Sequence, residues 1–241
     1  RSSDLVNWSF IEHCGKHQMK NISMVLFDMD GCLIDSEHLN VDLWKEVFET
    51  RNIPISYEEI LTWRGKSYLD VVDLVDTHTR SREESMALRD VRDQLFWQKL
   101  EQNEVQLKAH ASEIMDFLDL NGVPYACVTS TFESKAKRML EHFGILKRFA
   151  FVLCGDQVEK PKPDPALYLK AIEFAQVDIK NVLAFEDSRN GIEACNRAGV
   201  DVIYIPDRGL IDTEGLNVFN QVPDFNEAIN VIAPMLNKPR D

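Results

Sequence analysis

Long apolar runs and basic charge are both scarce in this sequence. It contains no stretch of about 18 uncharged apolar residues, the length that a membrane-spanning helix requires. Lysine and arginine number 27 against 40 aspartates and glutamates, which gives a formal net charge of −13. Proteins that bind nucleic acid generally carry a basic face, so neither nucleic acid nor a membrane is an expected partner. An anionic substrate would need local positive charge or a metal ion.

Cysteines are few and irregularly spaced. The five of them are Cys14, Cys32, Cys127, Cys154 and Cys195, an odd number without a C-x-x-C pair. The pattern favours reduced thiols over a disulfide framework or a zinc site, and with it a cytoplasmic location. Residues 1–18 differ in character from the rest of the chain, and we expect a leader or a non-native extension there, without an assigned function.

Short apolar runs alternate with amphipathic stretches along most of the chain. Runs of this kind are typical of parallel strands that are buried on both faces. The expected strands are Ser23–Phe27, Tyr125–Thr129, Phe149–Leu153, Val182–Phe185 and Val200–Ile205. With helices between them, the pattern predicts an α/β fold with a doubly wound parallel sheet.

Glycine and proline mark where the intervening helices begin and end. Helices are expected at Ala111–Leu120, at Ser134–Phe143 and at Ile192–Ala198, each followed by a glycine within two residues. Pro165 is placed to start another helix. A last helix is expected near Phe225–Leu236.

One interval lacks strand-like runs and is too long for a single crossover helix. Within it, Ser56 with Glu59 and Ser81 with Glu84 match the capping-box pattern of helix starts. We therefore expect an inserted all-helical cap domain. The predicted boundaries are 37–104 for the cap, with 19–36 and 105–241 forming the core domain.

The first strand ends in Asp28-Met29-Asp30-Gly31. The carboxyl ends of strands line the ligand crevice of an open α/β sheet, and Gly31 permits a tight turn there. One carboxylate could attack phosphorus while the other handles the proton. A solvated turn after a strand is an equally good interpretation of this segment taken alone.

Other strand ends carry complementary groups. Glu186-Asp187 would meet the first acidic pair, and clustered carboxylates favour Mg²⁺, although Asp187 or Ser188 could simply cap a helix. Thr129-Ser130 offers hydroxyls to a phosphate, or again a helix cap. The segment Lys160–Pro165 offers a lysine that could neutralise phosphoryl charge, or only a surface turn.

Taken together, these segments resemble the four motifs of the haloacid dehalogenase superfamily, in order and spacing. They are DMDG at 28–31, VTS at 128–130, KPKPDP at 160–165 and FEDSRNGIEACNRAG at 185–199. The β-phosphoglucomutase-like branch, with a helical cap after the first strand, is the most similar group. The resemblance implies a core sheet of order 5-4-1-2-3.

The resemblance also implies roles for individual residues. Asp28 is the expected nucleophile, Asp30 the general acid and base, and Ser130 a phosphate-binding hydroxyl. Lys160 is preferred to Lys162 as the catalytic lysine, because the family pattern is K-P-x-P-D. The implied Mg²⁺ ligands are Asp28, Asp30, Glu186 and Asp187, and further phosphate- or substrate-binding candidates are Gly31, Thr129, Arg64 and Lys66.

The expected activity is hydrolysis of a small phosphorylated metabolite, a sugar or polyol phosphate, by a monomer or weak homodimer. A sugar phosphate mutase is the alternative. The mutases that the chain resembles carry a histidine where this chain has Asn40, and an arginine near Tyr68. A receiver-like phosphoacceptor or a phosphate-binding protein is an alternative of another class, but a receiver lacks D-x-D-G and a helical insertion.

Overall fold

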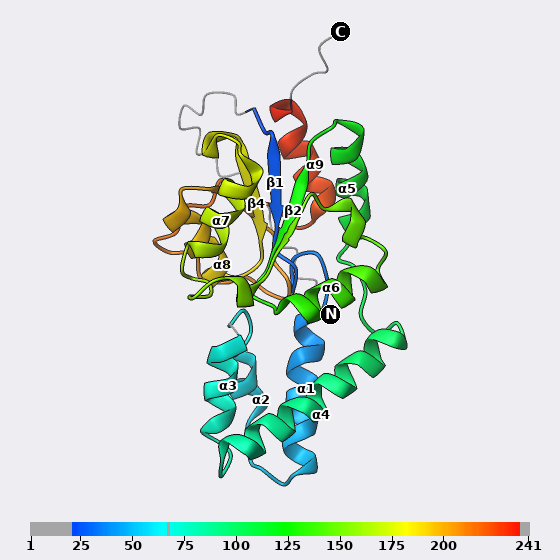
Figure 1. Cartoon of the computed structure of the whole chain (residues 1–241), viewed down its shortest axis with the longest axis vertical. Coiled ribbons are helices and arrows are strands. Elements are labelled where there is room, and N and C mark those ends of the chain that lie inside the picture. The colour runs from blue at the N-terminus through cyan, green and yellow to red at the C-terminus, as the bar shows by residue number, and fades with distance from the viewer. Residues whose placement is uncertain (1–20, 67, 237–241) are drawn as a thin grey trace, which may run out of the picture.

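The computed structural model describes residues 21–66 and 68–236 (Figure 1). Residues 1–18, expected to be a leader or extension, lie outside the described residues. The chain forms an upper lobe around a sheet and a lower lobe of helices (Figure 1).

The upper lobe is built on one parallel sheet. Its strands, within the described residues, are β1 (Met24–Phe27), β2 (Tyr125–Val128), β3 (Val152–Leu153), β4 (Val182–Glu186), β5 (Asp201–Tyr204) and β6 (Asn220–Gln221). They are ordered β3-β2-β1-β4-β5-β6, and every pair is parallel. The expected α/β fold and the expected order of five strands are confirmed. β6 was not predicted, because its two residues are polar and exposed.

Helices cover both faces of the sheet (Figure 1). One face packs against α5 (Ala111–Leu120), α6 (Glu133–His142) and α9 (Phe225–Ile232), and the other against α7 (Ala166–Ala175) and α8 (Arg189–Ala198). Val25 and Phe27 of β1 face the first layer, while Met24 and Leu26 face the second. This alternation follows from the twofold period of a strand, and it explains why β1 is apolar throughout.

Four helices that the structure describes between β1 and α5 form the lower lobe. They are α1 (Glu37–Thr50), α2 (Tyr57–Leu61), α3 (Tyr68–Asp76) and α4 (Arg82–Glu101). Val41, Trp44, Trp63 and Leu88 belong to an apolar cluster that is separate from those beside the sheet. The lobe therefore has a small core of its own, as an inserted cap requires. The boundaries 36/37 and 104/105 between domains stay a prediction.

The capping signals read from the sequence act at two of these helices. The Ser56 hydroxyl accepts a hydrogen bond from the Glu59 amide at 3.0 Å, and that of Ser81 from the Glu84 amide at 3.3 Å. The α2 and α4 starts are thus fixed locally, by side chains that replace missing backbone partners.

Short 3₁₀ turns complete the described chain: η1 (Leu146–Arg148), η2 (Gly155–Gln157), η3 (Ile179–Asn181) and η4 (Ala233–Met235). Four cysteines, Cys32, Cys127, Cys154 and Cys195, are buried free thiols. In the described part of the chain, no helix combines the length and the apolarity needed to cross a membrane.

Candidate active site

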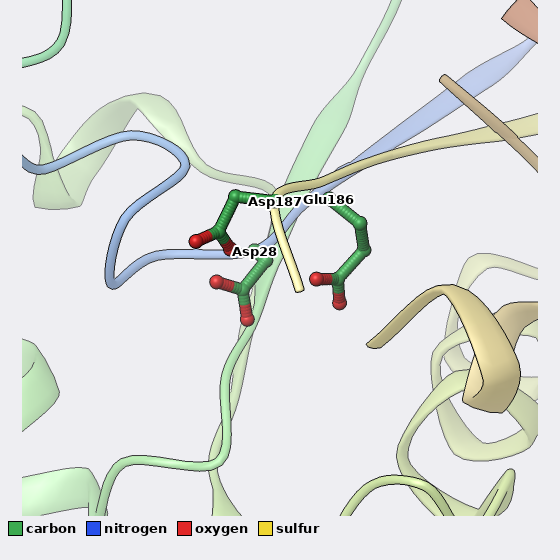
Figure 2. A group of neighbouring side chains, drawn as sticks. All are labelled: Asp28, Glu186 and Asp187. Atoms are coloured by element: carbon green, nitrogen blue, oxygen red, sulfur yellow. The ribbon is translucent and has the colours of Figure 1, made fainter. Parts of the chain in front are cut away.

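Three carboxylates meet where β1 and β4 end. Asp28 follows β1, Glu186 is the last residue of β4, and Asp187 comes next. One carboxylate oxygen of each lies within 4.8 Å of the others, and Figure 2 shows the three groups gathered beside the two strand ends. Neighbouring parallel strands bring the groups together because their carboxyl ends share one edge of the sheet.

Lys162 is the lysine of this site. Its ammonium group lies 2.6 Å from Asp28 Oδ1, 2.6 Å from Glu186 Oε1 and 2.8 Å from the Val128 carbonyl oxygen. Lys162 is buried, whereas Lys160 is exposed. The preference for Lys160 was therefore wrong. The segment Lys160–Pro165 contains the pattern Lys-Pro-x-Pro twice, and it is the lysine of the second copy that contacts Asp28 and Glu186.

Burial and like charges make the cluster electrostatically unfavourable without a cation. Burial raises the pKa of Asp187 well above its usual value, and the neighbouring Asp28 and Glu186 carboxylates raise it further. Burial also raises the pKa of Asp28, an effect that the Lys162 ammonium opposes. Asp187 Oδ1 is buried and has no hydrogen-bond partner among the described residues. An oxygen-lined site of this kind fits a hard divalent cation such as Mg²⁺.

Glu186 is held from several sides. Besides its contact with Lys162, it accepts a hydrogen bond from the Tyr168 hydroxyl at 2.5 Å. Gly191, in the first turn of α8, packs directly against its carboxylate, where a Cβ atom would overlap Glu186. Burial lowers the pKa of Lys162, but the Asp28 and Glu186 carboxylates outweigh it and raise the pKa above its usual value. Lys162 therefore remains a cation at the centre of the site.

Asp30 accepts hydrogen bonds from two hydroxyl groups. Ser36 donates a hydrogen bond to its Oδ1 at 2.6 Å, and Thr131 donates to its Oδ2 at 2.7 Å. Both donors fix the carboxylate, which lines the same pocket as Asp28. The sequence signalled neither contact, although Thr131 directly follows the Thr129-Ser130 pair.

The hydroxyl candidates after β2 lie at the site and do not cap the next helix. Ser130 and Thr129 line the pocket. The Thr129 hydroxyl accepts a hydrogen bond from the Thr131 amide at 3.0 Å, and the N-cap position of α6 is Phe132. At α8, by contrast, Ser188 is the N-cap, which leaves Asp187 in the carboxylate cluster.

Gly31 shapes the site without lining the pocket. Its amide donates to the Ile34 carbonyl oxygen at 2.8 Å, so the structure does not support a role in binding phosphate. Its φ of +82° belongs to the left-handed region, as expected for the tight turn. A Cβ atom here would overlap the Asp187 carboxylate. Glycine thus allows the first motif to pack against the fourth.

A pocket of about 320 Å³ connects the carboxylate cluster with the cap. Asp28, Asp30, Ser130, Lys162 and Asp187 lie on its core side. The cap side is lined by residues of α1, the segment that follows α2, and α4, among them Glu37, Asn40, Trp44, Trp63, Arg64, Lys66, Arg89 and Arg92. The pocket therefore has chemistry on one side and apolar and cationic surfaces on the other, as a small-molecule site requires.

Two cations, Arg64 and Lys66, lie in the loop of the cap that follows α2, and their surroundings differ. Arg64 forms an ion pair with Asp207 of the core, whose side chain is 3% exposed and also binds Lys108 at 2.7 Å. The Gly65 carbonyl oxygen accepts a hydrogen bond from Asn190 at 3.1 Å. Lys66 lines the pocket and is exposed. Arg64 thus joins the cap to the core, while Lys66 stays a candidate for contacting substrate.

Sequence comparison supports what this geometry indicates. Residues 25–205 match the family of haloacid dehalogenase-like hydrolases. A phosphorylated carbohydrates phosphatase of Thermotoga maritima is 28% identical, over 80% of this chain and 88% of its own length. The mitochondrial (DL)-glycerol-3-phosphatase 1 of Arabidopsis thaliana is 30% identical, over 84% of this chain and 70% of its own.

A solved structure shows the same fold. It is that of a predicted phosphoglycolate phosphatase from Haemophilus somnus 129pt, with a TM-score of 0.77 and 22% identity over 89% of this chain and 99% of the other. The chain therefore belongs to the haloacid dehalogenase-like hydrolases and is an enzyme of their phosphatase branch.

Proposed function

We propose that this enzyme hydrolyses a small phosphorylated metabolite, a sugar or polyol phosphate, with Mg²⁺ as cofactor and Asp28 as nucleophile. The observation that carries the proposal is the convergence of Asp28, Lys162, Glu186 and Asp187 on one side of a pocket of about 320 Å³. The names of the relatives from Thermotoga and Arabidopsis support a carbohydrate or polyol substrate.

The proposed reaction has two steps on Asp28. A carboxylate oxygen of Asp28 attacks phosphorus, and the bond from phosphorus to the substrate oxygen breaks. Asp30 gives its proton to the leaving oxygen, which departs as an alcohol. Asp30 then takes a proton from water as the water oxygen attacks the aspartyl-phosphate, and inorganic phosphate and the Asp28 carboxylate are released.

The surrounding residues would prepare both steps. Lys162 holds Asp28 Oδ1 at 2.6 Å, which orients the nucleophile and places a positive charge beside the phosphoryl group. Ser36 and Thr131 hold Asp30 in reach of the leaving oxygen. Asp28, Asp187 and Glu186 would hold Mg²⁺, with the Asp30 backbone as a further ligand. When bound, the ion would neutralise charge on the phosphoryl oxygens.

The cap is part of the proposal. Residues 37–104 would form a cap domain that closes the pocket over the substrate, with 19–36 and 105–241 as the core domain. The contacts of Arg64 with Asp207 and of Asn190 with Gly65 join the cap to the core. Closure of this kind excludes water and completes a site.

The mutase alternative is less well supported. Asn40 occupies the position of the mutase histidine, and its side-chain oxygen accepts a hydrogen bond from Arg92 at 3.2 Å. An amide cannot serve as a general base as a histidine can. A phosphoacceptor without turnover would leave the paired Asp30 without a chemical task.

The test is release of inorganic phosphate from a panel of sugar, polyol and glycolate phosphates, with Mg²⁺ and with a chelator, on wild type and Asp28→Asn. Release that requires both Mg²⁺ and Asp28 supports the proposal, and the ranking of substrates gives their class. Isomers of a hexose 1-phosphate, formed without phosphate release, would support the mutase instead. Unchanged release by Asp28→Asn would rule out the covalent mechanism.

A further inference from the structure

One wall of the pocket carries three cations that the chemistry at Asp28 does not use. They are Arg89 and Arg92 of α4 and Lys135 of α6, and we call them the distal cation wall. Arg89 is 7% exposed and Arg92 6%. Placing cations in such surroundings is costly, so buried arginines generally have a structural partner, a ligand or both. Here both arginines line a pocket that can hold a ligand.

Neighbouring side chains hold two of these cations in place. The Arg92 guanidinium donates to Asn40 Oδ1 at 3.2 Å, lies 3.0 Å from Asp93 Oδ1, and sits 5.1 Å from the centre of the Trp44 ring. The Lys135 ammonium lies 4.3 Å from the centre of the Phe96 ring. Aromatic faces and the Asn40 amide restrict how these long side chains move. An ordered cation of this kind loses little entropy on binding an anion.

Positive charge dominates this wall. Among the described residues, two carboxylates of the pocket act on these cations: Asp93, which lies beside Arg92, and Asp30, which acts on Lys135. Burial, together with the charges of Arg92 and Arg89, lowers the pKa of Lys135 to about 8, although Asp30 and Asp93 act in the opposite direction. Mutual repulsion among cations is relieved when an anion binds between them. The excess stands out in a chain whose net charge is −13.

The distal cation wall lines the same pocket as Asp30, the carboxylate that would protonate the leaving oxygen. The Asp30 carboxylate also raises the pKa of Lys135, so the two charges lie close enough to interact. The remainder of a substrate bound at Asp28 must pass Asp30. With the pocket limited to about 320 Å³, the far end of a small metabolite would reach Arg92 and Arg89.

We propose that the distal cation wall binds a second anionic group of the substrate, a carboxylate or a second phosphate. The preferred substrate is then a phosphate monoester that carries a further negative charge at its other end, rather than a neutral polyol phosphate. The inference rests on the proposed function and narrows its substrate class. Arginine suits this task because its guanidinium binds carboxylate and phosphate with two parallel hydrogen bonds.

The test uses pairs of substrates that differ in the second charge. One pair is 2-phosphoglycolate and 2-hydroxyethyl phosphate, and the other is fructose 1,6-bisphosphate and fructose 6-phosphate. For wild type we expect kcat/KM to be roughly tenfold or more higher for the charged member of at least one pair. A factor of this size corresponds to the free energy of one charge-assisted hydrogen bond. The first pair reports a carboxylate and the second a phosphate.

Substitutions in the distal cation wall then test whether these residues cause the preference for the charged substrate. Arg89→Met and Lys135→Met should each lower the ratio of kcat/KM for the charged member to kcat/KM for the neutral member by roughly tenfold. Lys135→Arg should keep most of the ratio. Lys137→Met is the matched control, because Lys137 lies on the same helix but pairs with Glu133 at the surface. A preference that survives both substitutions in the wall would overturn the inference.

A binding measurement separates failure of this inference from failure of the proposed function. Calorimetric binding of 2-phosphoglycolate and of fructose 1,6-bisphosphate to Asp28→Asn does not depend on turnover. We expect Lys135→Met in that background to weaken binding of the charged ligand roughly tenfold. Phosphate release without a preference for the charged substrate would support the phosphatase activity but refute anion binding by the distal cation wall. Failure to release phosphate even from p-nitrophenyl phosphate would refute the phosphatase activity. Equal binding of the charged ligand to Asp28→Asn and to Asp28→Asn with Lys135→Met would independently refute binding by the distal cation wall.

Discussion

Lys162 and Lys160 are two residues apart, yet their surroundings differ completely. Lys162 is surrounded by Asp28, Glu186 and a backbone carbonyl, and Lys160 is exposed. Removing the ammonium group of Lys162 would leave buried carboxylates without their counter-ion. The same change at Lys160 removes an exposed charge.

We expect Lys162→Met to lower kcat/KM by about 100-fold or more, as loss of a preorganised charge in an active site does. It should also lower the free energy of unfolding by about 3 kcal/mol, because a buried ion pair is broken. Lys160→Met is the matched control and should change neither quantity appreciably. Phosphate release and urea unfolding measure the two effects. A larger loss in the control would restore Lys160 as the catalytic lysine.

The comparison of these lysines shows how far sequence reasoning reaches at single residues. Asp28, Glu186 and Asp187 could be expected to meet, because each follows an apolar run and strand ends share an edge. The lysine was chosen wrongly, because Lys-Pro-x-Pro occurs twice in this segment and the aspartate after the first copy favoured Lys160. Ser36 and Thr131 could not be tied to Asp30, because those contacts depend on how separate loops fold back.

At the scale of elements, strong local signals predicted well and weak ones did not. α5 has the predicted limits, and the caps of α2 and α4 are those read from the sequence. β6 consists of two exposed polar residues and pairs, among the described strands, with β5 alone, so nothing in its composition distinguishes it from a loop. Such a strand is defined by its neighbour rather than by its own residues.

The start of α9 offers a test of a local signal that is remote from the proposed chemistry. The Asp224 carboxylate accepts hydrogen bonds from the amides of Asn226 at 2.9 Å and Glu227 at 3.1 Å. Asp224→Ala should cost about 1 kcal/mol of stability, the usual loss of an N-cap. Urea unfolding measures the loss, and Asp224→Asn should recover most of it. Unchanged stability in the alanine variant would mean that packing of Phe225 alone fixes this helix.

At the scale of the whole molecule, Asp207 links the two lobes. It binds Arg64 of the cap loop and Lys108 of the core, and it is nearly inaccessible to solvent. We expect Asp207→Asn to weaken cap closure and to lower kcat/KM by roughly tenfold, mainly through KM, because a closed lid retains substrate. Hydrogen exchange should become faster in residues 62–66. A fall in kcat with unchanged exchange would contradict a role in closure.

Metal binding should reverse the effect of one substitution on the stability of the whole chain. Without Mg²⁺, Asp187 is a buried carboxylate beside two others, and in the part of the chain that the structure describes its Oδ1 has no hydrogen-bond partner. Asp187→Asn removes a like charge from this group. We therefore expect the variant to be more stable than wild type in the presence of a chelator, as measured by thermal unfolding.

With Mg²⁺ at 100 times its Kd, the free energy of unfolding of wild type should rise by about 2.7 kcal/mol, because the ion binds the folded chain and not the unfolded one. For a protein of this size the gain corresponds to a rise in Tm of about 5–10 °C. Asp187→Asn should gain much less, so that wild type becomes the more stable of the two. If Mg²⁺ stabilises both proteins equally, Asp187 is not a ligand of the ion, and another group offsets the repulsion among the carboxylates. The sign reversal distinguishes a metal site from a purely structural carboxylate, since loss of a structural group destabilises the fold with or without the ion.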